Sequence, residues 1–198
     1  EKASNLITSR KDELGRLLSR EEGKTLAEGI GETMRAAQVF KFFAGEAIRN
    51  VGDAVASIRP GIDVTVEREA VGTIGLITPW NFPIAIPAWK LAPALAYGNA
   101  VVMKPAELTP GCAWELAKIL HEAGCPTGVF NLVMGPGSTV GARIVEHPGI
   151  DAISFTGSVA TGNTIAVQCA STGKRVQMEM GGKNPLVVVD DADLDVAV

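Results

Sequence analysis

The chain has 198 residues, a formal net charge of −4, 46% hydrophobic residues and 20% charged residues. This composition is typical of a globular protein with apolar residues for one large domain or slightly more. Scattered Lys and Arg and an aromatic fraction of 5% argue against a nucleic-acid-binding surface. Prolines and Lys90 interrupt the longest apolar run, residues 82–103, which argues against a membrane span.

The three cysteines, Cys112, Cys125 and Cys169, are an odd number without metal-ligand spacing. We therefore expect no disulfide framework, no metal site and a cytoplasmic protein. The first residues contain no secretory signal pattern. The sequence begins without Met and ends at "DADLDVAV" with no terminating signal, so we expect it to be a segment of a longer protein.

The first fifty residues are expected to be helical, because no proline interrupts residues 24–49 and apolar residues recur there at helical spacing. The segment "RPGID", residues 59–63, is a chain breaker. Residues 64–69 alternate apolar and polar side chains, which indicates a half-exposed strand. We expect this strand to be an edge or a hairpin arm outside the main core.

From residue 73 onward, short apolar strands alternate with helices. Strands are expected at residues 73–78, 99–104, 129–134, 150–156, 174–180 and 185–190, and helices at 112–124, 138–146 and 158–171. Gly124 should close the first of these helices. Near-continuous apolar strands that alternate with helices predict an α/β fold, with an open, Rossmann-like parallel sheet and helices on both of its faces.

Ligands bind beyond the carboxyl ends of the strands in such a sheet, so the residues after each strand are the candidates for a site. Asn81 follows the first strand in "PWNFP", between two prolines that stiffen the backbone. An amide held rigidly in this way can donate a hydrogen bond to a developing oxyanion. The alternative is that Asn81 caps the helix that follows.

Lys104 and Glu107 follow the second strand in "KPAE". An acid at this position suits ribose hydroxyls, and the lysine beside it can reach ribose or phosphate. The alternative is a solvated ion pair on a loop.

Two glycine-rich segments, "GPGSTVG" at 135–141 and "TGSVATG" at 156–162, lead from strands into helices. Free N–H groups at such helix starts can hold a phosphate. Neither segment is the G-x-G-x-x-G fingerprint, and glycine turns also occur in α/β proteins that bind no nucleotide, so both interpretations stay open.

Glu179 lies near the end of the strand "RVQMEM". In a regular strand it points with Gln177 to one side, away from Met178 and Met180. A carboxylate with apolar neighbours, next to Gly181, suits general-base chemistry. The alternative is an exposed or salt-bridged glutamate.

The motifs "TPWNFP", "KPAE", "FTGS" and "EMGGKNP", in this order and at these separations, resemble the aldehyde dehydrogenase superfamily. The resemblance covers essentially the whole chain, and four motifs in register are highly specific. It implies that residues 1–198 are an incomplete segment of the cofactor-binding domain in an incomplete aldehyde dehydrogenase fold. The catalytic domain would lie outside this sequence. Residues 53–70 would form an oligomerisation arm of an intact homodimer or homotetramer.

The family oxidises aldehydes to carboxylic acids with NAD or NADP. A cysteine thiolate attacks the carbonyl, a hydride leaves to the nicotinamide, and a glutamate-activated water hydrolyses the resulting thioester. The resemblance assigns this glutamate to Glu179 and the oxyanion-holding amide to Asn81. It places the nucleophilic cysteine beyond Val198, so the three cysteines present are expected to be packing or loop residues.

The resemblance assigns the cofactor contacts to several strand ends. Lys104 and Glu107 match the ligands of the adenosine ribose. The other matches are Ile77, Thr78, Pro79 and Trp80 beside the cofactor, Gly137 and Gly141 at the adenine side, Phe155, Gly157, Ser158 and Thr161 around the pyrophosphate and adenine, and Met180 and Gly181 near the nicotinamide. The Glu107 carboxylate repels a 2′-phosphate and favours NAD, while Lys104 leaves NADP possible.

Residues 78–108 most resemble the semialdehyde-oxidising branch of the family. The expected substrate is a small aldehyde such as α-ketoglutaric semialdehyde, and succinate-semialdehyde and betaine-aldehyde enzymes are close alternatives. Two rival functions remain, which are a nucleotide-binding module without catalysis and a structural α/β domain without a ligand.

Overall fold

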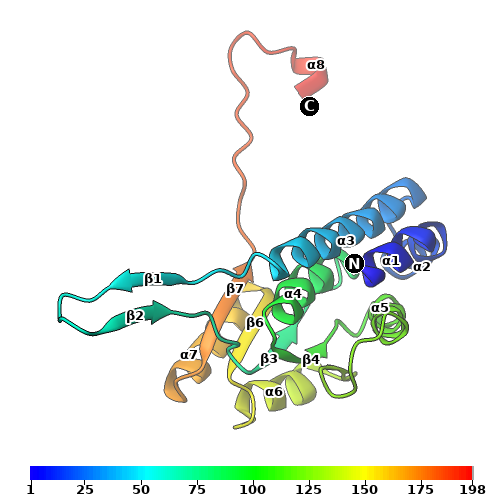
Figure 1. Ribbon diagram of the computed structural model, residues 1–198. Helices are drawn as coiled ribbons and strands as arrows, with labels where there is room; N and C mark the ends of the chain where they lie inside the picture. The colour runs from blue at the N-terminus through cyan, green and yellow to red at the C-terminus, as the bar shows by residue number, and fades with distance from the viewer. Residues whose placement is uncertain (198) are drawn as a thin grey trace.

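The central sheet positions every candidate residue. The computed structural model describes residues 1–197 (Figure 1). Five parallel strands lie in the order β5-β4-β3-β6-β7. They are β3 (Thr73–Ile77), β4 (Ala100–Lys104), β5 (Phe130–Leu132), β6 (Ala152–Gly157) and β7 (Arg175–Met180). The predicted α/β class with an open parallel sheet is confirmed.

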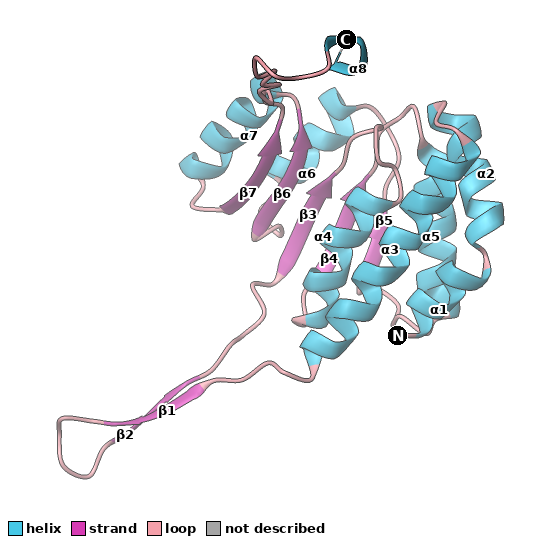
Figure 2. Cartoon of the chain, turned by 90° about the horizontal axis from the view of Figure 1, so that it is seen from above, coloured by secondary structure: helices cyan, strands magenta, loops and turns pink. Residues whose placement is uncertain are grey.

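Helices cover both faces of this sheet (Figure 2). One face carries α1 (Lys2–Ser9), α2 (Lys11–Glu22), α3 (Leu26–Ala47), α4 (Ala85–Ala96) and α5 (Pro110–Glu122). The other face carries α6 (Ala142–Glu146) and α7 (Val159–Ser171). Because successive side chains of a strand alternate, Leu76 of β3 joins the first core and Ile77 joins the second.

The helix ends follow from local sequence. Thr25 and Glu28 form a capping box at the start of α3, and Ser158 caps α7 by accepting a hydrogen bond from the Thr161 N–H. Gly124 follows α5 with a φ of +91°, which confirms the predicted helix end. The expected helix at 138–146 is instead a π-helical turn, η1 (Gly137–Gly141), followed by α6.

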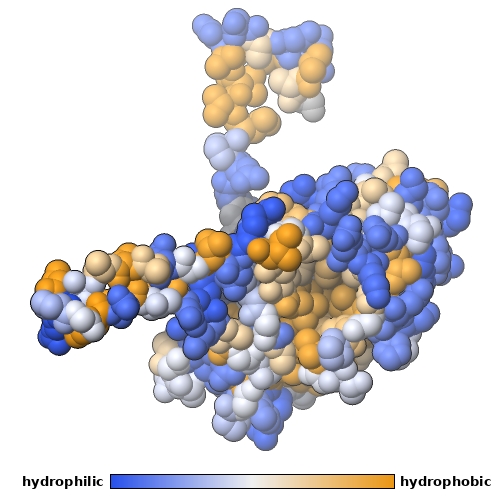
Figure 3. Space-filling model, viewed as in Figure 1, coloured by the Kyte–Doolittle hydropathy of each residue, from blue (hydrophilic) through white to orange (hydrophobic). Residues whose placement is uncertain are grey.

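The hairpin of β1 (Asp53–Ala56) and β2 (Asp63–Val66) projects away from the body of the molecule (Figures 1 and 2). The strand expected at 64–69 is shorter than predicted, and β1 was not expected. Apolar side chains lie exposed along the hairpin (Figure 3), including Val55, Val64 and Val66. The prediction of a hairpin arm outside the main core is confirmed, while its role in assembly stays a prediction.

The prediction of a strand at residues 185–190 is wrong. This segment is extended but pairs with no strand among residues 1–197, and it leads to the short helix α8 (Leu194–Ala197). Leu186 and Val187 are strongly exposed. Apolar, β-branched composition favours a strand, but a strand forms only where a hydrogen-bonding neighbour is present.

Replacing Leu76 by Ala should lower the free energy of unfolding by about 2–5 kcal/mol, because the side chain is 1% exposed on the central strand and leaves a cavity. Leu108→Ala is the matched control, since Leu108 is 71% exposed and should change stability by less than about 0.5 kcal/mol. Urea unfolding curves measure both values. Equal effects from the two variants would contradict the assignment of the core.

Candidate functional site

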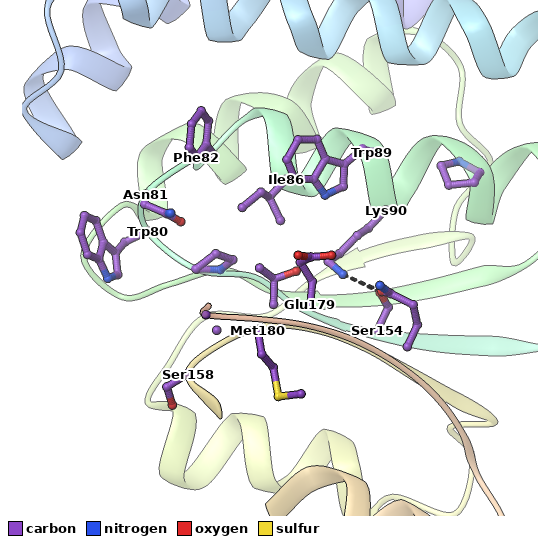
Figure 4. Close-up of a pocket in the computed structure, with 16 residues that line it drawn as sticks. Trp80, Asn81, Phe82, Ile86, Trp89, Lys90, Ser154, Ser158, Glu179 and Met180 are labelled. Atoms are coloured by element: carbon purple, nitrogen blue, oxygen red, sulfur yellow. Dashed lines mark hydrogen bonds between the residues drawn. The ribbon is translucent and has the colours of Figure 1, made fainter. Parts of the chain in front are cut away.

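The ends of β3, β6 and β7 meet at one edge of the sheet. Ile77 lies beside Phe155, and Thr156 lies beside Glu179. The loop that follows β3 and the end of β7 line a common cleft of about 970 Å³, which we call the rim cleft. Figure 4 shows Asn81 and Glu179 as part of its lining. The two side chains to which the resemblance assigned chemistry therefore belong to one site.

The sixteen predicted site residues fall into three groups. Eight line the rim cleft: Pro79, Trp80, Asn81, Gly157, Ser158, Glu179, Met180 and Gly181. Four line a second cleft of about 540 Å³ between η1, α6 and α7: Ile77, Gly137, Gly141 and Thr161. Four line neither cleft: Thr78, Lys104, Glu107 and Phe155. The first turn of α7 separates the clefts, because Ser158 lines one and Thr161 the other.

Asn81 does not cap the following helix, so that alternative is wrong. The N-cap position of α4 is Ile84, and no side chain at that position closes the helix end. Figure 4 shows the Asn81 amide directed into the rim cleft. Within the described residues this amide makes no hydrogen bond, whereas the Asn81 backbone carbonyl accepts one from Lys24. The amide is thus available to a ligand.

Glu179 and Met180 point to opposite sides of β7 (Figure 4), as the alternation in the sequence predicted. Met178 packs against the core that includes Ile165 of α7, and Gln177 faces α4. The Glu179 side chain belongs to an exposed residue in an open cleft. It forms no salt bridge among residues 1–197, which leaves the carboxylate available to a ligand.

Lys90 is a site residue that the sequence reasoning did not identify. It extends from α4 into the rim cleft, is 7% exposed, and donates to Ser154 Oγ at 2.7 Å and Gln177 Oε1 at 3.0 Å. Burial lowers the pKa of the Lys90 ammonium to about 8, and attraction to Glu179 opposes part of this shift. Its only sequence signal was a charge inside an apolar run, which requires polar partners when buried.

The start of α7 has the features of an anion site. The first-turn N–H groups of a helix lack partners within that helix, and the helix dipole favours negative charge there. Close by, the hydroxyls of Thr78 and Thr156 are buried and have no hydrogen-bond partner within the described part of the chain. Such unpaired hydroxyls at neighbouring strand ends are suited to a polar ligand.

The family model described as "Aldehyde dehydrogenase family" matches residues 1–198. The chain belongs to the aldehyde dehydrogenase family.

Similar proteins carry related names. The chain is 49% identical over 191 residues to the alpha-ketoglutarate semialdehyde dehydrogenase of Haloferax volcanii. This match covers 96% of this chain and 40% of the relative. It is 45% identical over 196 residues to the alpha-ketoglutaric semialdehyde dehydrogenase of Bacillus subtilis, and this match covers 99% of this chain and 40% of that relative. The chain therefore spans about 40% of the length of these curated relatives.

A solved structure shares the fold. The betaine aldehyde dehydrogenase of Staphylococcus aureus in complex with NAD+ superimposes with a TM-score of 0.95 at 38% identity. The match covers 99% of this chain and 39% of that chain. The incomplete aldehyde dehydrogenase fold expected from the sequence motifs is confirmed.

Lys104 and Glu107 of this aldehyde dehydrogenase segment do not form the solvated ion pair considered as an alternative. Lys104 is buried, and its Nζ donates to the carbonyls of Pro105 at 2.7 Å and Gly135 at 3.2 Å. Burial lowers its pKa, and attraction to Glu107 opposes this shift. The exposed Glu107 accepts the Gly137 N–H at 2.8 Å and so ties together the loops after β4 and β5.

The three cysteines are placed as packing or loop residues. Cys112 and Cys169 are fully buried in the two cores, and Cys125 is half-buried after α5. Burial raises the pKa of each thiol, which disfavours the nucleophilic thiolate. None of them lines the rim cleft.

Two further features of residues 1–197 bear on function. No helix in this range is both long and apolar enough to cross a lipid bilayer. No group of three or more His, Cys, Asp or Glu side chains is arranged there to hold a metal ion.

The low pKa of Lys90 predicts a specific pH dependence of stability. Between about pH 8 and the ordinary lysine value of 10.5, the folded chain has lost this proton and the unfolded chain retains it. The contribution of Lys90 to the free energy of unfolding therefore rises with pH between these two values. From pH 7 to 9.5, the unfolding free energy of the wild type should rise by about 2 kcal/mol relative to Lys90→Met.

Urea unfolding at the two pH values measures this difference. Lys11→Met is the matched control, because Lys11 is exposed on α2 and should leave the pH profile of the wild type unchanged. Parallel profiles for wild type and Lys90→Met would show that the buried ammonium titrates like an ordinary lysine.

Proposed function

We propose that the intact protein oxidises an aldehyde to its carboxylic acid with NAD, and that residues 1–198 supply most of the dinucleotide site together with two catalytic side chains. One observation carries the proposal. An amide donor, Asn81, and a carboxylate, Glu179, come from separate strand ends into one cleft that borders the start of α7. Family membership supports the reaction class.

The residues present fit a dinucleotide. The α7 N-terminus suits the pyrophosphate, the unpaired hydroxyls of Thr78 and Thr156 offer hydrogen bonds beside it, and the second cleft suits the adenine. When bound, NAD accepts a hydride from the substrate carbon. The Glu107 carboxylate favours NAD over NADP by repelling a 2′-phosphate, and the buried Lys104 keeps NADP possible. The similarity to an NAD-bound betaine aldehyde dehydrogenase supports the binding of NAD.

The two catalytic side chains have separate tasks. The Asn81 amide donates a hydrogen bond to the oxyanion that forms when a cysteine thiolate, from outside this sequence, attacks the aldehyde carbonyl. Glu179 takes a proton from the water molecule that hydrolyses the thioester. Its exposure in an open cleft gives water access to the carboxylate. The aldehyde, water and NAD thus yield the acid, NADH and a proton.

The substrate is proposed to be a small semialdehyde such as α-ketoglutaric semialdehyde. Two relatives at 49% and 45% identity carry that name. Betaine aldehyde and succinic semialdehyde are the competing substrates. Comparing kcat/KM for the three aldehydes with the intact protein decides between them, and the proposal requires the highest value for α-ketoglutaric semialdehyde.

The intact protein is further proposed to be a cytoplasmic homodimer or homotetramer in which the β1–β2 hairpin is an oligomerisation arm. The hairpin exposes the outer backbone edges of its two strands, which pair with no other strand in residues 1–197, and it exposes apolar side chains away from the body. An exposed strand edge of this kind is a template for pairing with another chain.

Glu179→Gln in the intact protein should retain the first burst of NADH and lower the steady-state rate by about 10²–10⁴-fold, because a neutral amide cannot deprotonate water. Stopped-flow NADH fluorescence separates the two phases, and calorimetry should give an unchanged affinity for NAD. Glu122→Gln is the control at an exposed glutamate on α5. Wild-type burst and steady-state rates in Glu179→Gln would refute the base assignment.

Glu107→Gln should raise kcat/KM for NADP relative to that for NAD by about tenfold, which corresponds to 1.4 kcal/mol, because it removes one negative charge next to the 2′-phosphate. Steady-state kinetics with both cofactors measure the ratio. An unchanged ratio would show that this carboxylate does not lie near the adenosine ribose.

A further inference from the structure

Glu32 on α3 is a buried carboxylate that binds the start of another helix. Its side chain is 2% exposed. Its Oε1 accepts the backbone N–H groups of Ile84 and Ala85, each at 3.0 Å. These groups belong to the first turn of α4, where no residue of the helix itself provides a side-chain cap. Glu32 therefore fixes the point at which α4 leaves the Asn81 loop.

Lys24 connects this carboxylate to the loop itself. Its Nζ lies 2.9 Å from Glu32 Oε2, donates to the Asn81 carbonyl, and lies 3.5 Å from the centre of the Phe82 ring. Among the described residues, this is the one hydrogen bond that reaches residues 79–83 from outside the loop and α4. One ion pair thus holds the backbone on both sides of Pro83.

The backbone of Lys24 is fixed on both sides. Gly23 ends α2 with a φ of +96°, and the capping box of Thr25 starts α3 immediately afterwards. The Lys24 N–H also donates to Glu22 Oε2 at 3.1 Å. A short, doubly capped connection gives its side chain a defined origin, which a lysine on a mobile loop would lack.

Stability alone is a weak explanation for this ion pair. Desolvation offsets much of the attraction in a buried pair, and apolar residues of similar volume often serve as well. The other hydrogen-bond partners of the two side chains are more informative. Lys24 donates to the Asn81 carbonyl, and Glu32 accepts the N–H groups at the start of α4. All of these partners lie in or next to the loop that carries the Asn81 amide. An oxyanion donor must be held within about 0.5 Å of its productive position.

We propose that Lys24 and Glu32 are positioning residues for the Asn81 amide, and that they set the rate at which the oxyanion forms. The inference rests on the proposed function, in which Asn81 holds that oxyanion. Without Lys24, the Asn81 carbonyl loses its anchor and the loop is held only through its covalent ends and α4.

The test is a double-mutant cycle in the intact protein, read as the rate of the NADH burst. Asn81→Ala should slow the burst by about 10²–10³-fold, the loss expected for one oxyanion donor. Lys24→Met should slow it by about 10–100-fold when Asn81 is present. In the Asn81→Ala background, Lys24→Met should slow it by less than about threefold, because a positioning residue has no effect without the group it positions.

Lys41→Met is the matched control, since Lys41 is exposed on the same helix as Glu32 and should leave the burst unchanged. If Lys24→Met does not fold, as judged by circular dichroism, Glu32→Gln replaces it in the cycle. This variant retains an acceptor for the α4 N–H groups and disrupts the contact to Lys24.

The outcomes separate the oxyanion role of Asn81 from the positioning role of Lys24 and Glu32. A burst slowed equally in both backgrounds, or not slowed at all, overturns the positioning role while Asn81 keeps its assignment. A wild-type burst in Asn81→Ala refutes the assigned role of Asn81 and the positioning role with it.

Discussion

The parallel register between β3, β6 and β7 holds the candidate site together, because it sets which side chains reach the same edge and the same face. Ser154 lies beside Gln177 and Thr156 beside Glu179. The first pair binds Lys90, and the second reaches the rim cleft. A slip of one residue in β7 would turn Glu179 toward α7 and away from Asn81. The apolar cores on both faces oppose such a slip, since the slip would expose Met178 and bury Gln177.

Residues of several helices and loops form hydrogen bonds that hold the polar groups around the rim cleft. Glu32 and Lys24 act on the Asn81 loop from the helical face, while Glu107 joins the loops after β4 and β5. Lys90 remains buried because Ser154 and Gln177 accept its hydrogen bonds, although burial weakens its hold on the proton. Of the hydroxyls without a partner in the described residues, that of Thr156 belongs to a residue lining the rim cleft, and that of Thr78 is buried at the neighbouring strand end. Hydrogen bonds thus hold the walls of the rim cleft, while the Asn81 amide and the Thr156 hydroxyl have no partner within the described residues.

The sequence predicted local features well and distant contacts poorly. Periodicity and glycines located the five strands of the central sheet, the end of α5 and the alternation around Glu179, because these depend on neighbouring residues. The strand expected at 185–190 failed because apolar composition does not supply a pairing partner. Lys90 was missed because its partner Ser154 lies 64 positions away. Glu32 was missed because the Ile84 N–H that it accepts lies 52 positions away. Asn81 and Glu179 were candidates because each follows or ends a predicted strand, and the family resemblance then assigned their roles. The sheet register explains why they meet.

A crystal structure of the intact protein with bound NAD tests the account most directly. The account predicts a pyrophosphate at the start of α7, the adenine in the second cleft, and a nicotinamide with Asn81 and Glu179 on the side of its reactive face. A dinucleotide bound elsewhere, or a Glu179 carboxylate turned out of the rim cleft with no path to the reacting carbon, would contradict it.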